Sequence, residues 1–599
     1  MAPELVDTGS MQKGPPSILA AATYLLISVV LFGILVLPHL TRSYLGNGAD
    51  PGDPNAFFWF LNWWPHAIGH GMNPFITHAV YAPEGINLTT VTSVPAASLV
   101  AMPVTLTLGP VAAFNLLMLI APVLAAWTAF LLCRYVTDSF WPSFAGGYLF
   151  GFSTYELAHL TAHLNLSMVF LVPLSVLLVL RYVKGDLGRR AFVRRLALVL
   201  FVQFLLSTEV FGTLTLFGTI AMGVAAFGGG SELRQRLKDA GFRIAAAYGI
   251  VAAALSPYLF YFFKGPVHAT NTLYDSDLAN VLIPTQITGL GGKALASVSA
   301  KFAGNYAETA AYVGLPLLLL AVSFVRGRRR LAGGRLLSIM LVVVALASLG
   351  SALRIRGLRT IPLPWALVKR LPLIGFALPD RFTLYLFLLL GLMAAIWLAT
   401  ASTTREGWKK WGLVIAGALV LLPNLPGGFW SGTTNVPQFF AEGMYRAYLK
   451  PGETVLVIPA GRPGADSQLW QIESGMYFRL AGGYLTRDTP RDLLCLPLAK
   501  AVLTSDLERY PLGREAPGQL RALLARRGIQ TVLLYGELGE LWRQVLAQLG
   551  LRGIDVGGLT LYHVPAEMIA PPAQGFPPPP SRCGGDVEPL AERPNRSVG

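Results

Sequence analysis

Repeated apolar runs of about 20 residues constrain this chain more than any other feature of its sequence. A helix of that length crosses about 30 Å of hydrocarbon, and the first such run covers residues 18–37. Hydrophobic residues make up 53% of the 599 residues and charged residues only 13%, a balance that does not suit a soluble core with a hydrated surface. The sequence therefore predicts an α-helical polytopic membrane protein.

Four short basic clusters set the expected orientation of these runs. Lys and Arg concentrate in cytoplasmic loops, so we place all four clusters on the cytoplasmic side of the membrane. The clusters are residues 181–195, 234–243, 326–335 and 405–410. Because the basic residues lie in short loops between apolar runs, the net charge of +15 does not indicate nucleic-acid binding.

A cytoplasmic amino terminus gives a consistent path of about eleven spans. The first run is too long for a secretory signal, so it is interpreted as a span. The segment 93–108 contains Pro95 and Pro103 and is interpreted as juxtamembrane or re-entrant, because another full span would reverse the parity. The expected spans are residues 18–37, 111–133, 141–155, 166–180, two arms within 196–227, 244–263, 312–325, 336–349, 382–400 and 411–422.

Four parts follow from this path. We expect a cytoplasmic tail over residues 1–17, a transmembrane domain over 18–429 and a small extracytoplasmic α/β domain over 430–569. In the last of these, β-branched and aromatic runs predict strands, and a charged stretch predicts a helix. The strands are expected at residues 454–458, 531–535 and 559–564, and the helix at 519–527. The Pro-rich residues 570–599 are expected to be disordered.

Several functional classes lack their motifs in this sequence. Cys133, Cys495 and Cys583 do not have the spacing of metal ligands, so neither a zinc site nor a disulfide framework is indicated. No Walker loop, dinucleotide fingerprint or nucleophile elbow occurs in a suitable strand-to-helix setting. ATP-driven transport is therefore disfavoured.

The first outward loop, residues 40–110, is the richest in polar and aromatic side chains. Carboxylates beside aromatic rings suit a sugar, because ring faces stack on its C–H surface while acids bind its hydroxyls. The alternative is an interfacial aromatic belt with solvated polar residues. The candidate residues of this loop are Asp50, Asp53, Trp59, Trp63, His66, His78 and Glu84.

A second outward turn places Glu156, His159 and His163 at helical spacings of three and four, so they could share one face. That arrangement is compatible with a divalent metal, but no fourth ligand is evident, and we prefer a hydrogen-bonding face. Glu209, at the turn of the next hairpin, is a further candidate for substrate binding. Its alternative is a carboxyl group that stays neutral or pairs locally.

Basic residues also occur on the predicted outer side, before the last two spans. Guanidinium groups there could clamp a phosphate or diphosphate at the membrane surface. The alternatives are lipid-headgroup binding and a surface pair of Asp380 with Arg381. The group comprises Arg354, Arg356, Arg359, Lys369, Arg370 and Arg381, and Asp275 and Asp277 are a weaker acidic candidate.

The layout of the chain resembles the GT-C superfamily of membrane glycosyltransferases over residues 18–422. This resemblance rests on the layout, namely a first span, a long outward loop with Gly-Asp-Pro, a multi-span core and an outward terminal domain. Three short motifs narrow it, namely Gly-Asp-Pro at 52–54, Phe-Ser-Thr-Tyr at 152–155 and Pro-Asp-Arg-Phe at 379–382. They are similar to those of an uncharacterised bacterial branch, and the segment 469–484 looks like the terminal domain of that branch. The resemblance implies a multi-pass protein of the bacterial plasma membrane.

The resemblance also implies a reaction. It is an inverting transfer of a sugar from a polyprenyl-phosphate donor to an extracytoplasmic acceptor, which is an envelope glycan, lipid or protein. By position, Asp53 would be the general base and Asp50 its nearest rival, with Asp50, Glu84 or Glu156 as a second acid. The basic group from Arg354 to Arg381 would hold the lipid phosphate.

Two other functions stay open. A lipid-linked sugar flippase would need internal repeats and polar residues through the membrane midplane, whereas no convincing repeat is visible and the polar groups cluster at one face. A noncatalytic envelope-assembly protein could retain the same fold.

Overall fold

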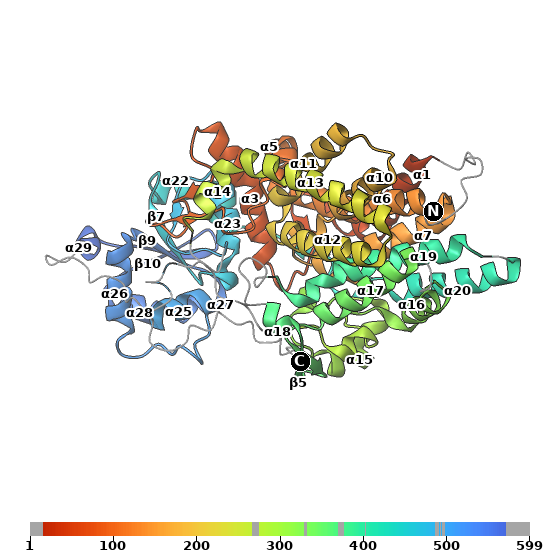
Figure 1. The fold of residues 1–599 in the computed structure, drawn as a ribbon. Coiled ribbons are helices and arrows are strands. Elements are labelled where there is room, and N and C mark those ends of the chain that lie inside the picture. The colour runs from red at the N-terminus through yellow and green to blue at the C-terminus, as the bar shows by residue number, and fades with distance from the viewer. Residues whose placement is uncertain are drawn as a thin grey trace.

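The computed structural model describes residues 16–265, 275–328, 332–368, 377–401, 403–485, 490, 493 and 497–570. Most of the two predicted tails, together with Lys369, Arg370, Cys495 and Cys583, lies outside the described residues. Figure 1 shows two regions, a large helical one and a smaller one that contains a sheet. We call residues 16–429 the membrane region and residues 430–570 the C-terminal region.

Each segment in which we expected a span contains a helix. These helices are α1 (Ser17–Ser28), α6 (Pro110–Thr137), α7 (Phe140–Gly151), α10 (Leu171–Lys184), α11 (Arg189–Leu206), α12 (Thr208–Gly228), α13 (Ser231–Ala254), α16 (Gly314–Arg328), α17 (Ala332–Ser348), α19 (Thr383–Ala399) and α20 (Thr404–Val420). Within the described residues, five helical segments are long and apolar enough to cross a membrane, or six if α13 and the bent α14 (Ser256–Phe262) form one span. The helical membrane fold is therefore confirmed, while the number of eleven spans stays a prediction.

Helix α6 lies at the centre of the membrane region and packs against α1, α7, α10 and α19. Glycines allow the close approach of α7 to α19. A Cβ atom on Gly146 would lie 2.6 Å from the carbonyl oxygen of Gly391, so only a residue without a side chain fits there. Small residues at helix contacts are the usual way to pack helices in a bilayer, where apolar area alone gives no preference for protein over lipid.

The first outward loop is folded throughout its length. It contains α3 (Gly52–Gly69), the short hairpin of β2 (Ile76–Thr77) and β3 (Ile86–Asn87), and two short helices, α4 (Pro95–Val100) and α5 (Met102–Leu108). The segment 93–108 is thus divided into two helices that are each too short to span a membrane, in agreement with its interpretation as juxtamembrane or re-entrant.

The C-terminal region is built on a five-stranded sheet. Its strand order is β10-β11-β9-β7-β8, with β7 parallel to β8 and β9, and with β11 antiparallel to β9 and β10. The strands are β7 (Thr454–Ile458), β8 (Arg479–Leu480), β9 (Thr531–Leu534), β10 (Gly553–Val556) and β11 (Leu559–His563), and the longer helices are α23 (Asp466–Glu473), α25 (Pro497–Thr504) and α26 (Ala516–Arg527). The central strands β7 and β9 are buried along their whole length, as expected for parallel strands covered on both faces.

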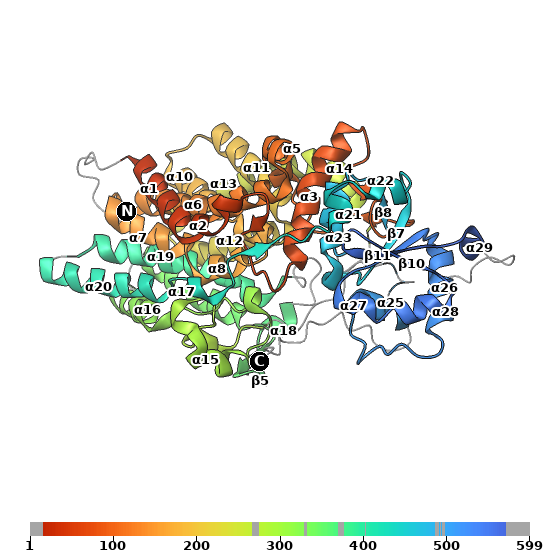
Figure 2. The same cartoon turned by 180° about the vertical axis from the view of Figure 1, so that it is seen from behind.

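Main-chain hydrogen bonds join the two regions. The amide of Leu480 donates to Ala79 at 2.8 Å and the amide of Ala82 donates back to Leu480 at 2.9 Å, so the first loop continues the sheet beyond β8. The fully buried Arg527 donates to the carbonyl groups of Tyr81, Ala82 and Ala481. A second pairing joins β1 (Ser43–Tyr44) to β6 (Gly432–Thr433). Figures 1 and 2 accordingly show α3 between the helices of the membrane region and the sheet.

Candidate active site at the start of helix α3

Asp53 lies in the first turn of α3, where Gly52-Asp53-Pro54 begins the helix. Proline suits this turn because an N–H group there would have no helical partner, and the free N–H groups of a helix start favour a carboxylate. Three side chains from distant segments surround Asp53. His163 Nε2 lies 3.6 Å from Oδ2, Arg462 Nη2 lies 3.8 Å from Oδ2, and the hydroxyl of Tyr484 donates to Oδ1 at 3.4 Å.

Gly52 makes room for this arrangement. A Cβ atom at that position would lie 2.8 Å from Cγ of Arg462 and 3.0 Å from Cε1 of Tyr484. Carbon atoms in a packed interior do not approach so closely without displacing one another. The glycine of the motif therefore allows two side chains of the C-terminal region to reach the start of α3.

Arg462 joins the two acids at the start of this helix. Its Nε donates to Oδ1 of Asp50 at 2.7 Å, and its Nη2 donates to Oδ2 of the same carboxylate. Its Nη1 donates to the hydroxyl of Tyr484 at 3.2 Å. A two-point contact between a guanidinium and a carboxylate fixes direction as well as charge. Arg462 thus holds Asp50 firmly and contacts Asp53 from one side.

His163 connects Asp53 to a second set of charges in the membrane region. Its Nδ1 lies 3.9 Å from Oε1 of Glu308 in the short helix η5 (Tyr306–Glu308). Glu308 accepts hydrogen bonds from Nε and Nη2 of Arg381 in η6 (Pro379–Phe382), while Nη1 of Arg381 donates to Glu209 in the first turn of α12. We call the connected set the Asp53 network: Asp50, Asp53, His163, Glu209, Glu308, Arg381, Arg462 and Tyr484.

The network keeps Asp53 ionised. Burial opposes the charged form, but the hydrogen bond and charge of His163, together with the charges of Arg462 and Arg381, lower the pKa of Asp53 to about 2. The side chain of Asp53 is 26% exposed, so an incoming group can reach it. An ionised, reachable carboxylate can accept a hydrogen bond, and then a proton, from a hydroxyl group.

The second outward turn contains α8 (Thr154–Leu160), and its three candidate residues, Glu156, His159 and His163, have different surroundings. His159 Nδ1 lies 3.1 Å from His163 Nδ1, and burial, followed by the charges of His163 and Arg381, holds the pKa of His159 well below its ordinary value. Glu156 is buried, and neither carboxyl oxygen has a hydrogen-bond partner in the described part of the chain. Burial raises the pKa of Glu156, which favours its neutral form. The turn thus contributes His163 to the network directly and His159 behind it.

Trp59 and Trp63 lie inside the molecule. The side chain of Trp59 is fully buried, its Nε1 donates to Gln471 of α23 at 2.8 Å, and its ring stacks on Trp63 with centroids 5.1 Å apart. Asn55, one turn earlier, donates to Asp466 of the same helix α23 at 2.8 Å. The structure therefore places these indole rings in the packing of α3 against the C-terminal region, with no ring face available for a sugar.

His66, His78 and Glu84 lie away from the network. His66 is near the opposite end of α3, about 20 Å from Asp53 along the helix axis, and its ring lies beside that of His70. His78 Nδ1 lies 3.0 Å from the carbonyl oxygen of Pro83, and the carboxylate of Glu84 pairs with Arg527 at 3.2 Å. Among the contacts of the described residues, none connects these three side chains to Asp53.

The described members of the predicted basic group have separate partners. Arg381 is held between two glutamates, whereas Arg354 Nε lies 3.8 Å from Asp275. Arg356 is exposed, and its backbone amide donates to the carboxylate of Asp277. Asp275 and Asp277 therefore stabilise the loop around β4 (Ala352–Ile355) and β5 (Leu358–Pro362).

Asp380 does not form the surface pair with Arg381 that was one alternative. Its side chain is 1% exposed. It accepts a hydrogen bond from the hydroxyl of Ser276 at 2.6 Å and another from the amide of Ala310 at 2.8 Å. The backbone just after η5 is therefore fixed next to Arg381, which helps to place Glu308.

In the described ranges, no three His, Cys, Asp or Glu side chains are placed so that they could hold a metal ion. Within the Asp53 network, each carboxylate is satisfied by an arginine, a histidine or a tyrosine. The arrangement fits general acid–base chemistry by side chains, with charges held in place before a substrate binds.

Sequence reasoning missed three members of the network, Glu308, Arg462 and Tyr484. Arg462 follows β7 and Tyr484 follows β8, and these strands are parallel. The carboxyl ends of parallel strands meet at one edge of a sheet, where loops commonly carry functional side chains. The strand at 454–458 was predicted, so that rule could have pointed to Arg462, whereas β8 was not predicted and Tyr484 had no such signal. For Glu308 the indication in the sequence was weaker, namely an acid in a loop expected on the outer side, just before the predicted span at 312–325.

Comparisons with solved structures reveal the fold. The arabinofuranosyltransferase AftD from Mycobacteria is 13% identical, with a TM-score of 0.55, and the match covers 92% of this chain and 41% of that one. ArnT from Cupriavidus metallidurans, bound to undecaprenyl phosphate, is 9% identical over 93% of this chain and 99% of that one, with a TM-score of 0.47. The archaeal oligosaccharyltransferase AglB from Archaeoglobus fulgidus, in complex with an inhibitory peptide and a dolichol-phosphate, is 11% identical over 92% and 74%, with a TM-score of 0.46.

The likeness to AftD shows that this chain has a GT-C fold, as its motifs led us to expect. A sequence comparison with curated proteins finds no match. The family model described as "Domain of unknown function (DUF6311)" matches residues 21–422, which cover the membrane region almost completely. The chain therefore belongs to this family.

Proposed function

We propose that this protein is a membrane glycosyltransferase with Asp53 as its general base. The observation that carries the proposal is a reachable, ionised carboxylate at the junction of the membrane region and the C-terminal region, within a GT-C fold. In the proposed reaction, an acceptor hydroxyl outside the cytoplasm attacks the anomeric carbon of a sugar on a polyprenyl-phosphate donor. The acceptor is an envelope glycan, lipid or protein.

The bond changes assign a task to each group. A bond forms between the acceptor oxygen and the anomeric carbon, and the bond from that carbon to the phosphate oxygen breaks. The phosphate leaves with the electron pair, and the hydroxyl proton passes to Asp53. Attack on the face opposite the leaving group inverts the anomeric centre. Because Asp53 is ionised before the acceptor arrives, it can orient the hydroxyl and then take its proton.

The partners of Asp53 hold its carboxylate in place. His163 and Arg462 approach the same oxygen, Oδ2, while Tyr484 donates to Oδ1. The carboxylate is therefore fixed by both regions of the molecule. We assign His163 and Arg462 as positioning residues, since a misplacement of about 1 Å in a reacting group can cost about 100-fold in rate.

The leaving phosphate needs cationic neighbours, and the proposal keeps Arg354, Arg356 and Arg381 in that role. Arg356 is exposed and free to turn toward a lipid phosphate at the membrane surface. Arg381 lies within the network but already contacts two glutamates, so a phosphate would have to share or replace one of these contacts. Of the three, Arg356 is the one whose side chain can move with least loss of existing contacts.

The test measures the incorporation of label from radiolabelled polyprenyl-phosphate sugars into membrane glycans, lipids and proteins. We expect Asp53→Asn to lower incorporation by a factor of about 100 to 10,000, the usual contribution of a general base. Asp50→Asn and Glu156→Gln rank the rival acids. Glu232→Gln is the matched control, because this exposed glutamate on α13 pairs with Arg236 at the surface and with no other residue of the described ranges.

The labelling results distinguish an error in the assignment of the base from an error in the assignment as a transferase. Wild-type turnover in Asp53→Asn, with normal expression, would show that another group is the base. If no donor of the panel labels any product above the level of membranes without the protein, the transferase assignment itself fails, and the flippase or envelope-assembly function becomes the better hypothesis.

A further inference from the structure

A second polar site lies at the other end of the membrane region. Helices α6, α10 and α11 enclose a pocket of about 760 Å³ near the ends of α6 and α10 and the start of α11. On α6, Asn115 donates to carbonyl groups of the first loop, whereas Arg134, in the last turn, lines the pocket. These residues are about 28 Å apart along the helix axis, so the pocket and the Asp53 network lie near opposite surfaces of the bilayer.

The pocket has a basic rim and apolar walls. Arg134 and Arg181 occupy the last turns of α6 and α10, and Arg195 lies in the second turn of α11. About one helical turn deeper in the membrane the walls consist of leucines. They are Leu131, Leu174, Leu177, Leu178 and Leu198.

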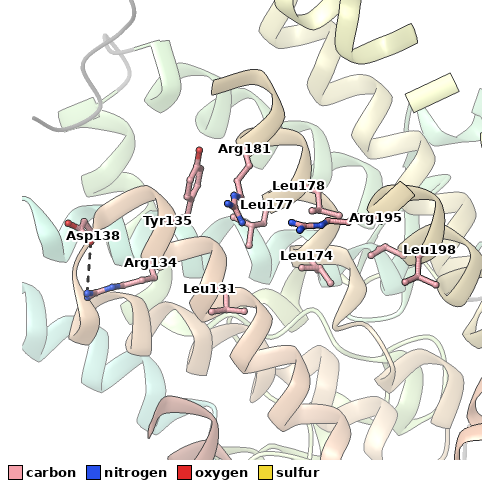
Figure 3. A pocket seen from close by; sticks show the side chains of 11 residues that line it. Leu131, Arg134, Tyr135, Asp138, Leu174, Leu177, Leu178, Arg181, Arg195 and Leu198 are labelled. Carbon is pink, nitrogen blue, oxygen red and sulfur yellow. Dashed lines mark ion pairs between the residues drawn. The ribbon is translucent and has the colours of Figure 1, made fainter. Parts of the chain in front are cut away.

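Among the described residues, two of the three arginines have no acidic partner. Arg134 lies 4.0 Å from Asp138, and the other nearby acid, Asp186, accepts a hydrogen bond from Tyr135. Neither Arg181 nor Arg195 forms an ion pair within the described part of the chain. Figure 3 shows their side chains extending toward each other, while Arg134 turns to Asp138.

Two guanidinium groups that face each other without an anion repel, and a phosphate between them would remove that repulsion. Guanidinium groups bind phosphate oxygens with two parallel hydrogen bonds. The leucines below would stay in contact with water or loose lipid if only a free phosphate were bound. A molecule with both an anionic headgroup and a hydrocarbon chain can contact the arginines of the rim and the leucines of the walls at the same time.

We propose that this pocket binds an anionic phospholipid, with its headgroup phosphate between Arg181 and Arg195 and one acyl chain along the leucines. Membrane leaflets on the cytoplasmic side attract basic segments of proteins in the same way, and the basic cluster 181–195 is one of the four that we expect to face the cytoplasm. The pocket volume lies within the range of about 300–1,000 Å³ found for small-molecule sites. The proposal does not depend on the transferase assignment.

The test uses the full-length protein in detergent with phosphatidylglycerol or phosphatidylcholine of identical acyl chains. Native mass spectrometry over a lipid titration gives the Kd for each lipid. We expect tighter binding of phosphatidylglycerol to the wild type, and we expect R181Q/R195Q to raise its Kd roughly 25-fold, since each basic contact near a membrane surface contributes about fivefold. The Kd for phosphatidylcholine should stay within about twofold.

The matched control is R190Q/R194Q, which removes the same amount of charge at two exposed positions of α11 outside the pocket. It should leave the Kd for phosphatidylglycerol within about twofold, and R181K/R195K, which keeps both charges, within about fivefold. Equal affinity of the wild type for the two lipids, or equal losses in the two glutamine variants, would overturn the proposal. Tighter binding of a polyprenyl phosphate than of phosphatidylglycerol would overturn the assignment to a phospholipid.

Discussion

The Asp53 network and the pocket at the opposite surface use the same residue type in contrasting ways. In the network, Arg381 lies between Glu209 and Glu308, and Arg462 lies between Asp50 and Asp53. In the pocket, Arg181 and Arg195 face each other, and no carboxylate of the described residues pairs with either of them. An arginine whose charge is matched internally holds the protein together, whereas an unmatched one is available to an external anion. The effects of mutation should therefore differ sharply between the two sites.

The largest effect is expected from Arg381→Leu. The substitution leaves Glu308 buried, with its side chain only 5% exposed, and Glu209 partly buried, both without their cation. Breaking a buried ion pair from one side typically costs about 3–5 kcal/mol of stability. We expect a loss of that size in the free energy of unfolding, measured by chemical denaturation of the purified protein.

The control replaces all three charges with neutral side chains. In R381L/E209Q/E308Q no buried charge is left unpaired, so most of the lost stability should return. If R381L unfolded at the same denaturant concentration as the wild type, the three groups would not be coupled and the contrast with the pocket would be lost.

Acid should weaken the contact of the two regions at Asp53. Its pKa in the folded protein is about 2, below the ordinary value of 3.8, so the stability that its partners provide is complete above pH 4 and is lost as the pH falls toward 2. The contribution is about 2 kcal/mol. Trp59 donates a hydrogen bond to α23 of the C-terminal region, and Trp470 lies on that helix, so the fluorescence of both should report a loosening of the two regions.

Other carboxylates also titrate in this range, so the comparison of wild type with Asp53→Asn is the decisive measurement. The variant has no charge to lose at position 53 and should show a smaller change between pH 4 and 2. Identical pH curves for the two proteins would mean that Asp53 gains no stability from its partners.

A smaller effect is expected from Gly52→Ala. The added methyl group would displace Arg462 or Tyr484, and overpacking of this kind costs about 1 kcal/mol where a flexible side chain can give way. Transferase activity should fall more than stability does, because the position of Asp53 depends on both displaced groups. Gly69→Ala at the far end of the same helix is the matched control, since nothing lies within 4 Å of a Cβ atom there. Equal effects of the two substitutions would show that helix formation, and not the close approach, governs the result.

The smallest effect is expected from R181Q/R195Q in lipid-free detergent. These side chains form no ion pair in the described part of the chain, so the free energy of unfolding should change by less than about 0.5 kcal/mol. A loss comparable with that of R381L, measured by the same denaturation experiment, would reveal internal partners and erase the distinction between the two sites.

The helices of the membrane region could be predicted from sequence because the signal is local. Long apolar runs and basic loops identify the segments around α6, α10 and α19 without reference to the rest of the chain. Asp53 could also be selected, since it lies in a short motif in an outward loop. Its partners could not, because Tyr484 is 431 positions away and no local pattern records which distant residue a carboxylate will meet.

Trp59 and Trp63 show where a compositional argument fails. Aromatic residues among acids are typical both of a sugar site and of a helix that is packed on several sides. Which of the two is present depends on whether another element covers the helix. Here α23 covers it, and Gln471 of α23 accepts a hydrogen bond from Trp59. The partners of the basic group before the last spans could not be predicted for a related reason, since Arg354 and Arg381 have different acidic partners, each supplied by a separate segment.

The pairing of the first loop with the C-terminal region has a consequence for biogenesis. The ribosome makes Asp50 early and its partner Arg462 only 412 residues later. In the topology that we expect, the loop crosses the membrane during that interval, before the strand edge at Leu480 that it joins has been made. Any truncated chain would thus display unpaired acids and an open strand edge outside the membrane, a signature that quality-control proteases could use to tell an unfinished molecule from a finished one.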